Sequence, residues 1–342
     1  MDDFQFLQNP VSKKWVILAP RRAKRPDVAK GMEPVCPFCP GREGEEEELY
    51  RVSENSVNSD NLSIGKSEGQ SVRISEFSDY SDKSDLSGGL SLPSIPKTTS
   101  ADWLVRVVPN KYPFAPIHEI IIHSPDHHKN FGELPLNHVE LILQTYRQRF
   151  NTHKDKGQVY IFHNRGEGGG ESLPHPHTQL AVVDISVRLD IPRLASDEEL
   201  AVLNEQEKRE VQETLHFTLF CPFTSQWPDE VWVVPKVRGR LFGEITDEEI
   251  KDLSHTLSRL IRIMDLRHGQ EFPFNFYIYP GGDWYLRFIP RQKSLGGFEI
   301  GTGIFVNTQN PKETIEFIKT HFESPDEEKI KKEHQAEYGR HV

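Results

Sequence analysis

An internal repeat constrains the fold more than any other feature of this chain. Residues 118–150 (HEIIIHSPDHHKNFGELPLNHVELILQTYRQRF) align without a gap on residues 229–261 (DEVWVVPKVRGRLFGEITDEEIKDLSHTLSRLI), so that the FGE triplet of one copy falls on the FGE triplet of the other. Each copy reads as an apolar strand, a turn and an amphipathic helix, with helices predicted over Leu136–Phe150 and Asp247–Met264. The chain is therefore expected to fold as two equivalent halves.

Each copy of the repeat is followed by a strand, a loop and a second strand. In the first half, β-branched and aromatic residues predict these strands over Gln158–His163 and Leu180–Val183, after an earlier strand at Asp102–Pro109. In the second half the corresponding strands are predicted at 274–280 and Asp283–Pro290. The pattern predicts an α+β fold with two antiparallel-sheet halves and flanking helices.

The stretch that says most about function is 163–180, HNRGEGGGESLPHPHTQL. Because alternate residues of a strand share a face, we expect His175, His177 and Gln179 to point the same way. Two imidazoles and an amide, beside the backbone N–H groups of a glycine-rich loop, suit an anionic ligand such as a phosphate. The alternative is a solvated turn with incidental histidines.

The two halves differ in their histidines. The DWYLRF strand of the second half has no histidine where the first half has His175 and His177, and Arg238 replaces His127. We therefore expect the chemistry in the first half, with the second half completing the pocket or supporting the fold.

Cys36 and Cys39 form a CxxC pair, which can supply two thiolates to one tetrahedral Zn²⁺. The rival interpretation is a redox dithiol, which usually lies at the start of a helix that follows a strand. Three prolines and a glycine surround the pair and favour a stiff metal-binding knuckle. No second CxxC is present, so histidine would have to complete the site.

A short strand at Trp15–Leu18 precedes a basic turn in RRAKRP, which contains Arg22 and Arg25. Arginine offers a planar fork that matches phosphate oxygens, so this turn could serve an anionic ligand. A solvated turn explains the same residues equally well.

Other segments are less regular. Residues 43–101 are acidic and then serine-rich, and we expect a flexible insertion there. A glutamate-rich helix is predicted over Asp197–Phe217, and Cys221 is expected to be a buried apolar residue. The glycines of GGFEIGTG (296–303) imply close backbone approach at a ligand, or an ordinary loop.

We predict an N-terminal half over 1–190 and a C-terminal half over 191–322, which ends in a helix at Pro311–Phe322. The charged tail at 323–342 is expected to be frayed.

Composition excludes several classes of protein. A formal net charge of −11 argues against nucleic acid as the main partner, because phosphate backbones recruit clustered Lys and Arg. No apolar run is long enough to span a bilayer, and the N-terminus shows neither a basic nor an apolar signal region. With only three cysteines, a disulfide framework is not expected. These features are typical of a cytoplasmic protein with no membrane partner.

Taken together, the motifs resemble the galactose-1-phosphate uridylyltransferase branch of the histidine-triad superfamily. The matching stretches are NPVSKKWVILAPRRAKRP, CPFCPGRE, RVVPNKYPF, SPDHHKNFGEL, HNRG…ESLPHPHTQ and GGFEIGTG, which follow the family's order over most of residues 8–310. The resemblance implies a duplicated histidine-triad fold, often a homodimer, in which a histidine takes a nucleoside monophosphate from a nucleotide sugar.

The resemblance also assigns roles to individual residues. Structural zinc would be held by Cys36, Cys39, His127 and His175. His177 resembles the nucleophile, Gln179 the glutamine that contacts phosphate, and Ser172 a residue that binds phosphate or orients the histidine. The remaining substrate-binding positions implied are Arg22, Arg25, Asn110, Phe114, Asn164, Gly169, Gly170, Phe298 and Glu299, the last two reached across the dimer.

The expected activity is that of a UDP-glucose–hexose-1-phosphate uridylyltransferase of galactose metabolism, working by a ping-pong mechanism through a nucleotidyl-histidine. The substrates would be a nucleotide sugar and a sugar phosphate or phosphate. Glu171 and Thr178 depart from the family pattern, and the ending GGFEIGTG also resembles ADP-glucose phosphorylases. An adenylyl-transferring phosphorylase, a hydrolase and a zinc-stabilised nucleotide-binding protein without turnover are the alternatives. The second half lacks the histidines for a further metal, so no iron site is expected.

Overall fold

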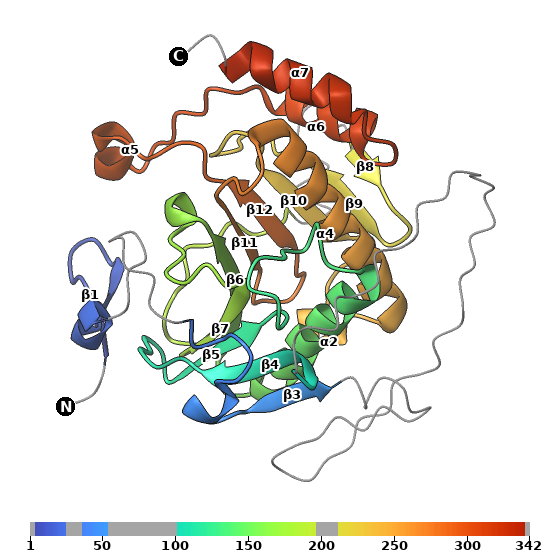
Figure 1. Ribbon diagram of the computed structural model, residues 1–342. Coiled ribbons are helices and arrows are strands. Elements are labelled where there is room, and N and C mark those ends of the chain that lie inside the picture. Colours follow the sequence, from blue (N-terminus) through green and yellow to red (C-terminus); the bar gives the residue numbers. More distant parts are fainter. Residues whose placement is uncertain (1–3, 25–35, 54–100, 196–210, 339–342) are drawn as a thin grey trace.

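The computed structural model describes residues 4–24, 36–53, 101–195 and 211–338. Its centre is one antiparallel ten-stranded sheet in the order β3-β4-β5-β7-β6-β11-β12-β10-β9-β8 (Figure 1). The strands are β3 Tyr50–Ser53, β4 Trp103–Pro109, β5 Ile117–Ile122, β6 Gln158–Arg165, β7 His177–Val183, β8 Val211–Glu213, β9 Phe217–Phe220, β10 Val231–Pro235, β11 Phe274–Ile278 and β12 Leu286–Pro290.

The sheet consists of two equivalent halves that join at the β6–β11 pair, which we call the seam. Read outward from that pair, the first half runs β6, β7, β5, β4, β3 and the second runs β11, β12, β10, β9, β8. The two sequences of strands are equivalent, and they join without a break because β6 and β11 pair antiparallel from Ile161–Ile278 to Arg165–Phe274. The predicted fold class, two antiparallel halves with flanking helices, is confirmed.

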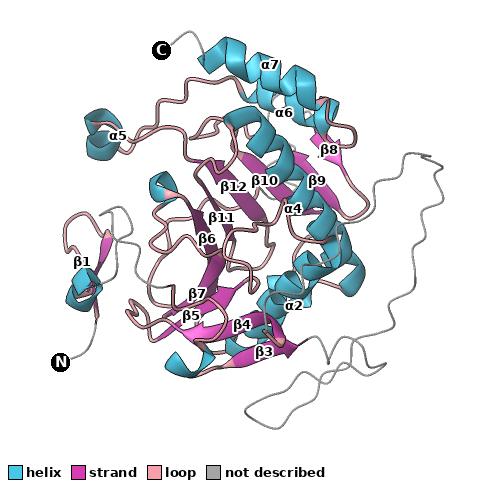
Figure 2. Ribbon diagram, in the orientation of Figure 1, coloured by secondary structure: helices cyan, strands magenta, loops and turns pink. Residues whose placement is uncertain are grey.

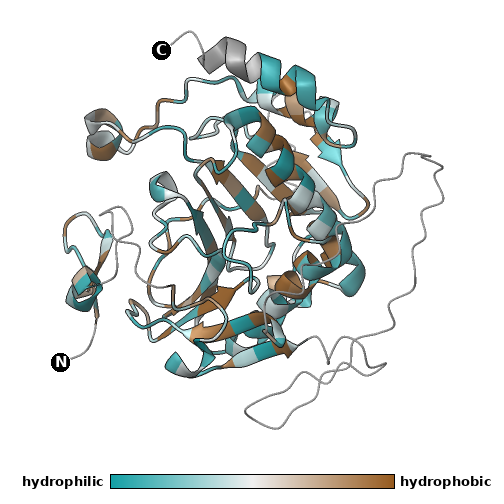
Figure 3. Cartoon of the chain, in the orientation of Figure 1, coloured by the Kyte–Doolittle hydropathy of each residue, from teal (hydrophilic) through white to brown (hydrophobic). Residues whose placement is uncertain are grey.

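The two long helices, α2 Leu136–His153 and α4 Asp247–His268, pack on one face of the sheet (Figure 2). Both begin where the repeat predicts. Their apolar residues, such as Ile142 and Leu257, share one buried core with alternate strand residues such as Ile161 and Phe276. Figure 3 shows hydrophobic and hydrophilic residues mixed along the strands and along the two long helices.

The opposite face of the sheet is aromatic and polar. Trp232 and Tyr285 stack there at 4.4 Å between ring centroids, and Tyr160 and Phe162 stack at 5.5 Å. Two segments lie outside the sheet in Figure 1: the hairpin of β1 Gln5–Gln8 and β2 Trp15–Leu18, and the short helix α5 Gly297–Thr302. Among the described helices, none is both long and apolar enough to cross a membrane.

The expected flexible insertion over 43–101 is wrong at its N-terminal end. Residues 43–53 are folded, and β3 pairs with β4 because Tyr50 and Val52 bury their side chains in the main core. Arg51 and Arg106 both bond to Glu48 at 2.6 Å, which further fixes the segment. Residues 54–100 lie outside the described chain.

The helix predicted over Asp197–Phe217 is wrong in its last part, because 211–213 and 217–220 form strands β8 and β9. Residues 197–210 lie outside the described chain. Phe217 and Leu219 point into the core and Thr218 points out, so the alternation of a half-buried strand overrides the glutamate-rich composition before it. Cys221 is buried, as predicted.

The C-terminal region also differs from expectation. The glycine-rich 296–303 segment is neither a tight turn nor a loop, since Gly297–Thr302 is the helix α5, closed by Gly303 at φ 72°. Helix α6 covers Pro311–His321, close to the prediction. The tail expected to fray instead forms α7, Glu327–Tyr338, held on α4 by buried Ile330 and by the Arg262–Glu327 ion pair at 2.7 Å.

Substitution of Phe276, which lies on β11 at the seam, tests whether the stability of the protein depends on packing between the two halves. Its side chain is fully buried among core residues of both halves, so Phe276→Ala is expected to lower the free energy of unfolding by about 3–5 kcal/mol. Urea unfolding followed by tryptophan fluorescence measures this. The matched control is Phe223→Ala, whose ring is exposed, and equal losses for the two variants would contradict the account.

Candidate active site and metal centre

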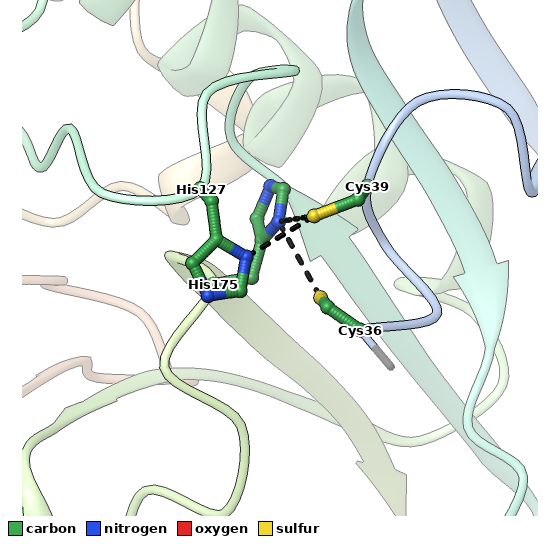
Figure 4. Close-up of side chains that lie close together, drawn as sticks. All are labelled: Cys36, Cys39, His127 and His175. Atoms are coloured by element: carbon green, nitrogen blue, oxygen red, sulfur yellow. Dashed lines mark hydrogen bonds between the residues drawn. The ribbon is translucent and has the colours of Figure 1, made fainter. Parts of the chain in front are cut away.

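Two cysteines and two histidines from three separate segments meet at one point beside the sheet (Figure 4). Cys36 and Cys39 come from the N-terminal knuckle, His127 from the loop after β5, and His175 from the residues just before β7. The Cys39 sulfur lies 3.1 Å from His127 Nδ1 and 3.7 Å from His175 Nδ1, and the Cys36 sulfur lies 3.6 Å from His175 Nδ1. These are the four residues that the family resemblance groups together.

The donor set fits a tetrahedral metal ion. Ligand atoms about 2.0–2.3 Å from Zn²⁺ lie about 3.5 Å from one another, which matches the observed separations. His175 Nε2 donates to the Ser124 carbonyl at 2.8 Å, which leaves Nδ1 as the nitrogen that can coordinate. Burial and the neighbouring Cys36 raise the pKa of Cys39 to about 11, so two thiolates here need a cation beside them.

His177 is the first residue of β7 and is buried against the ring of Phe38, 5.3 Å away between centroids. Its Nδ1 donates to the His175 carbonyl at 2.8 Å. In neutral imidazole the other nitrogen then carries the lone pair, so Nε2 is the nucleophilic atom. The metal ligand His175 and the candidate nucleophile are thus linked through the backbone.

Gln179 follows two residues along the same face, and its amide has a fixed direction. Phe114 N–H donates to His118 Nδ1 at 3.3 Å, which leaves His118 Nε2 as a donor to Gln179 Oε1 at 2.9 Å. Asn110 accepts from Tyr112 N–H and turns its amide nitrogen toward the same oxygen, 3.5 Å away. With Oε1 facing two donors, the NH₂ end of Gln179 is the end left to meet an anion.

Asn164 lies beside His177. The β6–β7 pairing sets Phe162 opposite Gln179 and His163 opposite Thr178, and the next step of the same register sets Asn164 opposite His177 on the same face. Gly169, in the glycine-rich loop, is packed so closely on β11 that a Cβ would come 2.9 Å from the Phe274 carbonyl. The loop therefore needs glycine at this position.

Glu171 closes the glycine-rich loop on itself. Its carboxylate accepts from Gly166 N–H at 2.7 Å, while its own N–H donates to the Gly166 carbonyl at 3.1 Å. Glu171 and Ser172 line a cavity of about 370 Å³ with His163 and Arg165. Gly170, the next predicted position, is exposed at φ 78° in the same loop.

Arg22 is held by the segment after β4. Its Nη1 donates to the Tyr112 carbonyl at 2.6 Å, and its guanidinium lies 5.0 Å from the centroid of the Phe114 ring. Phe114 in turn packs on His118 at 4.2 Å, so Arg22, Phe114 and the Gln179 network form one group. Arg25 lies outside the described residues.

Phe298 and Glu299 are not brought to this group. They lie on α5, at the edge of the molecule and away from β7 (Figure 1). Phe298 is 56% exposed, and Glu299 is buried, accepting from Gly296 N–H at 3.1 Å and Lys293 Nζ at 3.3 Å.

A buried polar cluster behind the nucleophile was missed by the sequence analysis. His163 Nδ1 donates to the His177 carbonyl at 2.9 Å, and Thr178 bonds to His123 at 2.8 Å and to Tyr146 at 2.5 Å. Burial, then the neighbouring His177, lowers the pKa of His163 to about 3, so this ring is neutral. The signal in the sequence was Thr178, a polar residue on the core-facing side of a strand.

The second half has an arginine where the first has the nucleophile. His163 and Phe276 face each other across the β6–β11 pair and are therefore equivalent. Thr178 pairs with His163 and Phe288 pairs with Phe276, so Thr178 and Phe288 are equivalent too. The residue before each of them is then His177 in the first half and Arg287 in the second. Arg287 is buried and bonds to both carboxylate oxygens of Glu230, at 2.7 and 2.8 Å. The expected asymmetry is therefore present in the described residues.

Comparison with known proteins agrees with this geometry. Residues 117–184 match the family model of the galactose-1-phosphate uridyl transferase N-terminal domain. This match confirms the resemblance to the galactose-1-phosphate uridylyltransferase family. It is 27% identical to an ADP-glucose phosphorylase of Arabidopsis thaliana, over 91% of each chain. It is also 27% identical to the galactose-1-phosphate uridylyltransferase of Thermotoga maritima, over 59% of this chain and 73% of that protein.

The fold of the family is also seen in a solved structure. A crystal structure of the Arabidopsis thaliana ADP-glucose phosphorylase with bound ADP-glucose superposes with a TM-score of 0.61 at 22% identity, covering 93% of this chain and 99% of that one.

The metal centre predicts a selective loss of bound metal. Cys39→Ser or His127→Ala removes one of four ligands and is expected to lower both the bound metal per chain and the melting temperature. Elemental analysis of the purified protein and a thermal melt measure these. Cys221→Ser, which alters the cysteine outside the cluster, is the control, and an unchanged metal content in Cys39→Ser would refute the assignment.

The buried carboxyl of Glu171 is expected to make the stability of the folded protein depend on pH. Burial raises its pKa from 4.5 to about 7, so the folded state holds its proton more tightly and this group's stabilising contribution falls as the pH rises through that window. Glutamine keeps an acceptor for Gly166 N–H without the charge. Glu171→Gln should therefore gain stability over wild type as the pH rises, up to about 3 kcal/mol above pH 7.

Thermal melts of both proteins between pH 5 and pH 9 measure the difference. The matched control is Glu167→Gln, an exposed carboxylate of the same loop, which is expected to leave the pH profile of wild type. A Glu171→Gln difference that stays constant over this range would contradict the account.

Proposed function

We propose that the protein is a nucleotidyltransferase that takes a nucleoside monophosphate from a nucleotide sugar onto His177. The observation that carries the proposal is the hydrogen bond from His177 Nδ1 to the His175 carbonyl, because it leaves Nε2 as the nitrogen that carries the lone pair. The relatives' activities support the same class of reaction.

The reaction follows from this geometry. His177 Nε2 attacks the α-phosphorus, the bond from phosphorus to the oxygen of hexose 1-phosphate breaks, and the leaving group departs with the electron pair. The positive charge that forms on the ring is balanced by the His175 carbonyl at Nδ1. A second phosphate then attacks the same phosphorus and returns the lone pair to Nε2, which is ping-pong chemistry.

Phosphoryl-type transfer needs alignment and donors for the equatorial oxygens more than further covalent chemistry. The amides of Asn164 and Gln179 flank His177, and the backbone of the glycine-rich loop adjoins them. Arg22 would contribute positive charge from the Phe114 side of the group.

Zinc is the metal we propose for the Cys₂His₂ cluster, because two thiolates and two imidazoles in a tetrahedron are its characteristic ligands. With four protein ligands it would be structural. His175 would be fixed by it, and with His175 the carbonyl that orients His177.

Two donor–acceptor pairs fit the proposal. Uridylyl transfer from UDP-glucose to a hexose 1-phosphate, a step of galactose metabolism, is favoured by the match of 117–184 to the uridyl transferase model. Adenylyl transfer from ADP-glucose to inorganic phosphate is favoured by the relative that aligns along 91% of both chains. In either case we propose a homodimer, in which α5 brings exposed Phe298, with buried Glu299 beside it, to the partner's site.

The decisive experiment is intact mass spectrometry after brief exposure to UDP-glucose and, separately, to ADP-glucose. Wild type is expected to gain the mass of a nucleoside monophosphate, uridylyl or adenylyl according to the true substrate. His177→Ala should lose the gain. His255→Ala, on α4 at the other face of the sheet, should retain it.

The outcomes separate the alternatives. No adduct, with nucleoside monophosphate released by wild type but not by His177→Ala, would indicate a hydrolase. Nucleotide binding without adduct or turnover would identify a zinc-stabilised binding protein and overturn the proposal.

A further inference from the structure

Three side chains form a chain of hydrogen bonds that runs from the second half of the molecule to the nucleophile. Arg291 follows β12, Asn275 lies on β11, and Asn164 lies on β6 opposite His177. Arg291 Nη1 donates to Asn275 Oδ1 at 2.9 Å, and Asn275 Nδ2 donates to Asn164 Oδ1 at 2.8 Å. Of these three residues, the sequence motifs indicate only Asn164.

The direction of this chain is fixed by its first member. Arginine can only donate, so the oxygen of Asn275 must face it. The nitrogen of Asn275 must then face Asn164, and the oxygen of Asn164 must face Asn275. Within the described chain Asn164 Nδ2 has no protein acceptor, which leaves it as the donor toward a ligand at His177.

Arg291 and Asn275 are each held by further contacts. The guanidinium of Arg291 stacks on Trp227 at 4.3 Å, and its backbone N–H donates to the Pro273 carbonyl at 2.7 Å. Asn275 Nδ2 also donates to the Gly169 carbonyl at 2.7 Å. The same side chain therefore places both the amide beside His177 and the glycine-rich loop.

We infer that Arg291 and Asn275 are positioning residues that hold the NH₂ group of Asn164 toward the phosphates of a nucleotide at His177. The inference rests on the proposed function and extends it, because it assigns the second half a part in the reaction. Without the arginine, the Asn164 amide could turn over and present its oxygen, which repels a phosphate oxygen.

The test is the rate at which wild type and variants form the nucleotidyl adduct in a single turnover. Asn164→Ala and Asn275→Asp are each expected to slow it about 10- to 100-fold, the range for losing a hydrogen bond to a charged group. Aspartate matches asparagine in shape but cannot donate, so it forces Asn164 to turn its nitrogen away from the ligand.

A double-mutant cycle separates positioning from a general structural effect. If Arg291 acts through Asn275 on Asn164, adding Arg291→Met to Asn164→Ala should change the rate by no more than about twofold, because Asn275 Nδ2 can still donate to the Gly169 carbonyl. Rate losses that multiply in the double variant would overturn the inference. So would an Asn275→Asp variant that reacts at the wild-type rate.

Two further variants serve as control and rescue. Asn151 also bonds across the two halves, from α2 to the Gly243 carbonyl at 2.8 Å, so Asn151→Asp makes the same chemical change away from the site and should keep the wild-type rate. Arg291→Lys retains a group that only donates and should react faster than Arg291→Met. Equal rates for these two Arg291 variants would contradict the direction-setting role.

Binding of UMP and AMP, measured by calorimetry, tests the inference without turnover. Asn275→Asp should weaken the binding of whichever nucleotide wild type binds more tightly. If wild type binds a nucleotide but forms no adduct, the proposed function fails, and this weakening alone decides for or against the positioning role. If wild type binds neither nucleotide, both the function and the positioning role are overturned.

Discussion

The pairing of β6 with β11 is the constraint on which the rest of the structure depends. It joins the duplicated halves into one sheet, and its register sets Asn164 against Asn275 and His163 against Phe276. A slip of one residue would turn every side chain of one strand to the other face. Asn164 would then leave the face of His177, and the glycine-rich loop would lose its contact with β11. Stability and site geometry are therefore set by the same register.

The amides of Gln179 and Asn164 flank the candidate nucleophile His177, and each is oriented by groups that can only donate. Backbone N–H groups bond to His118 and Asn110 and so fix which atoms these side chains turn toward Gln179. The guanidinium of Arg291 fixes Asn275 in the same way, and Asn275 in turn orients Asn164. An amide free to turn could present either end to a phosphate, whereas an amide so held presents its nitrogen. The site is thus prepared for anions although the whole chain carries a net charge of −11.

Much of this could be predicted from the sequence, where the signal is local. The repeat predicts both long helices to their first residue, Leu136 and Asp247, and the motifs group the four residues of the candidate metal site. What escaped prediction depends on pairing between distant segments. The roles of Asn275 and Arg291 depend on the register between β6 and β11, and α7 is held on α4 by Ile330 and by the Arg262–Glu327 ion pair in an otherwise charged sequence. Strands β8 and β9 complete the edge of the sheet at a segment that the glutamate-rich composition had assigned to a helix.

In the duplicated sheet, the second half has a different residue at the position of the candidate nucleophile His177. Arg287 occupies the position of His177 but is permanently protonated, and Glu230 satisfies it with two hydrogen bonds, so it has no lone pair to offer. A buried ion pair such as Arg287–Glu230 adds little net stability, but removing one partner would leave the other charge buried and unpaired, which is strongly destabilising. The second half instead places Asn275 and Arg291 beside the β6–β11 pair. Arg287 lies on the same strand that leads to Arg291, but its guanidinium bonds to Glu230 and to the Tyr277 hydroxyl and not to Asn275.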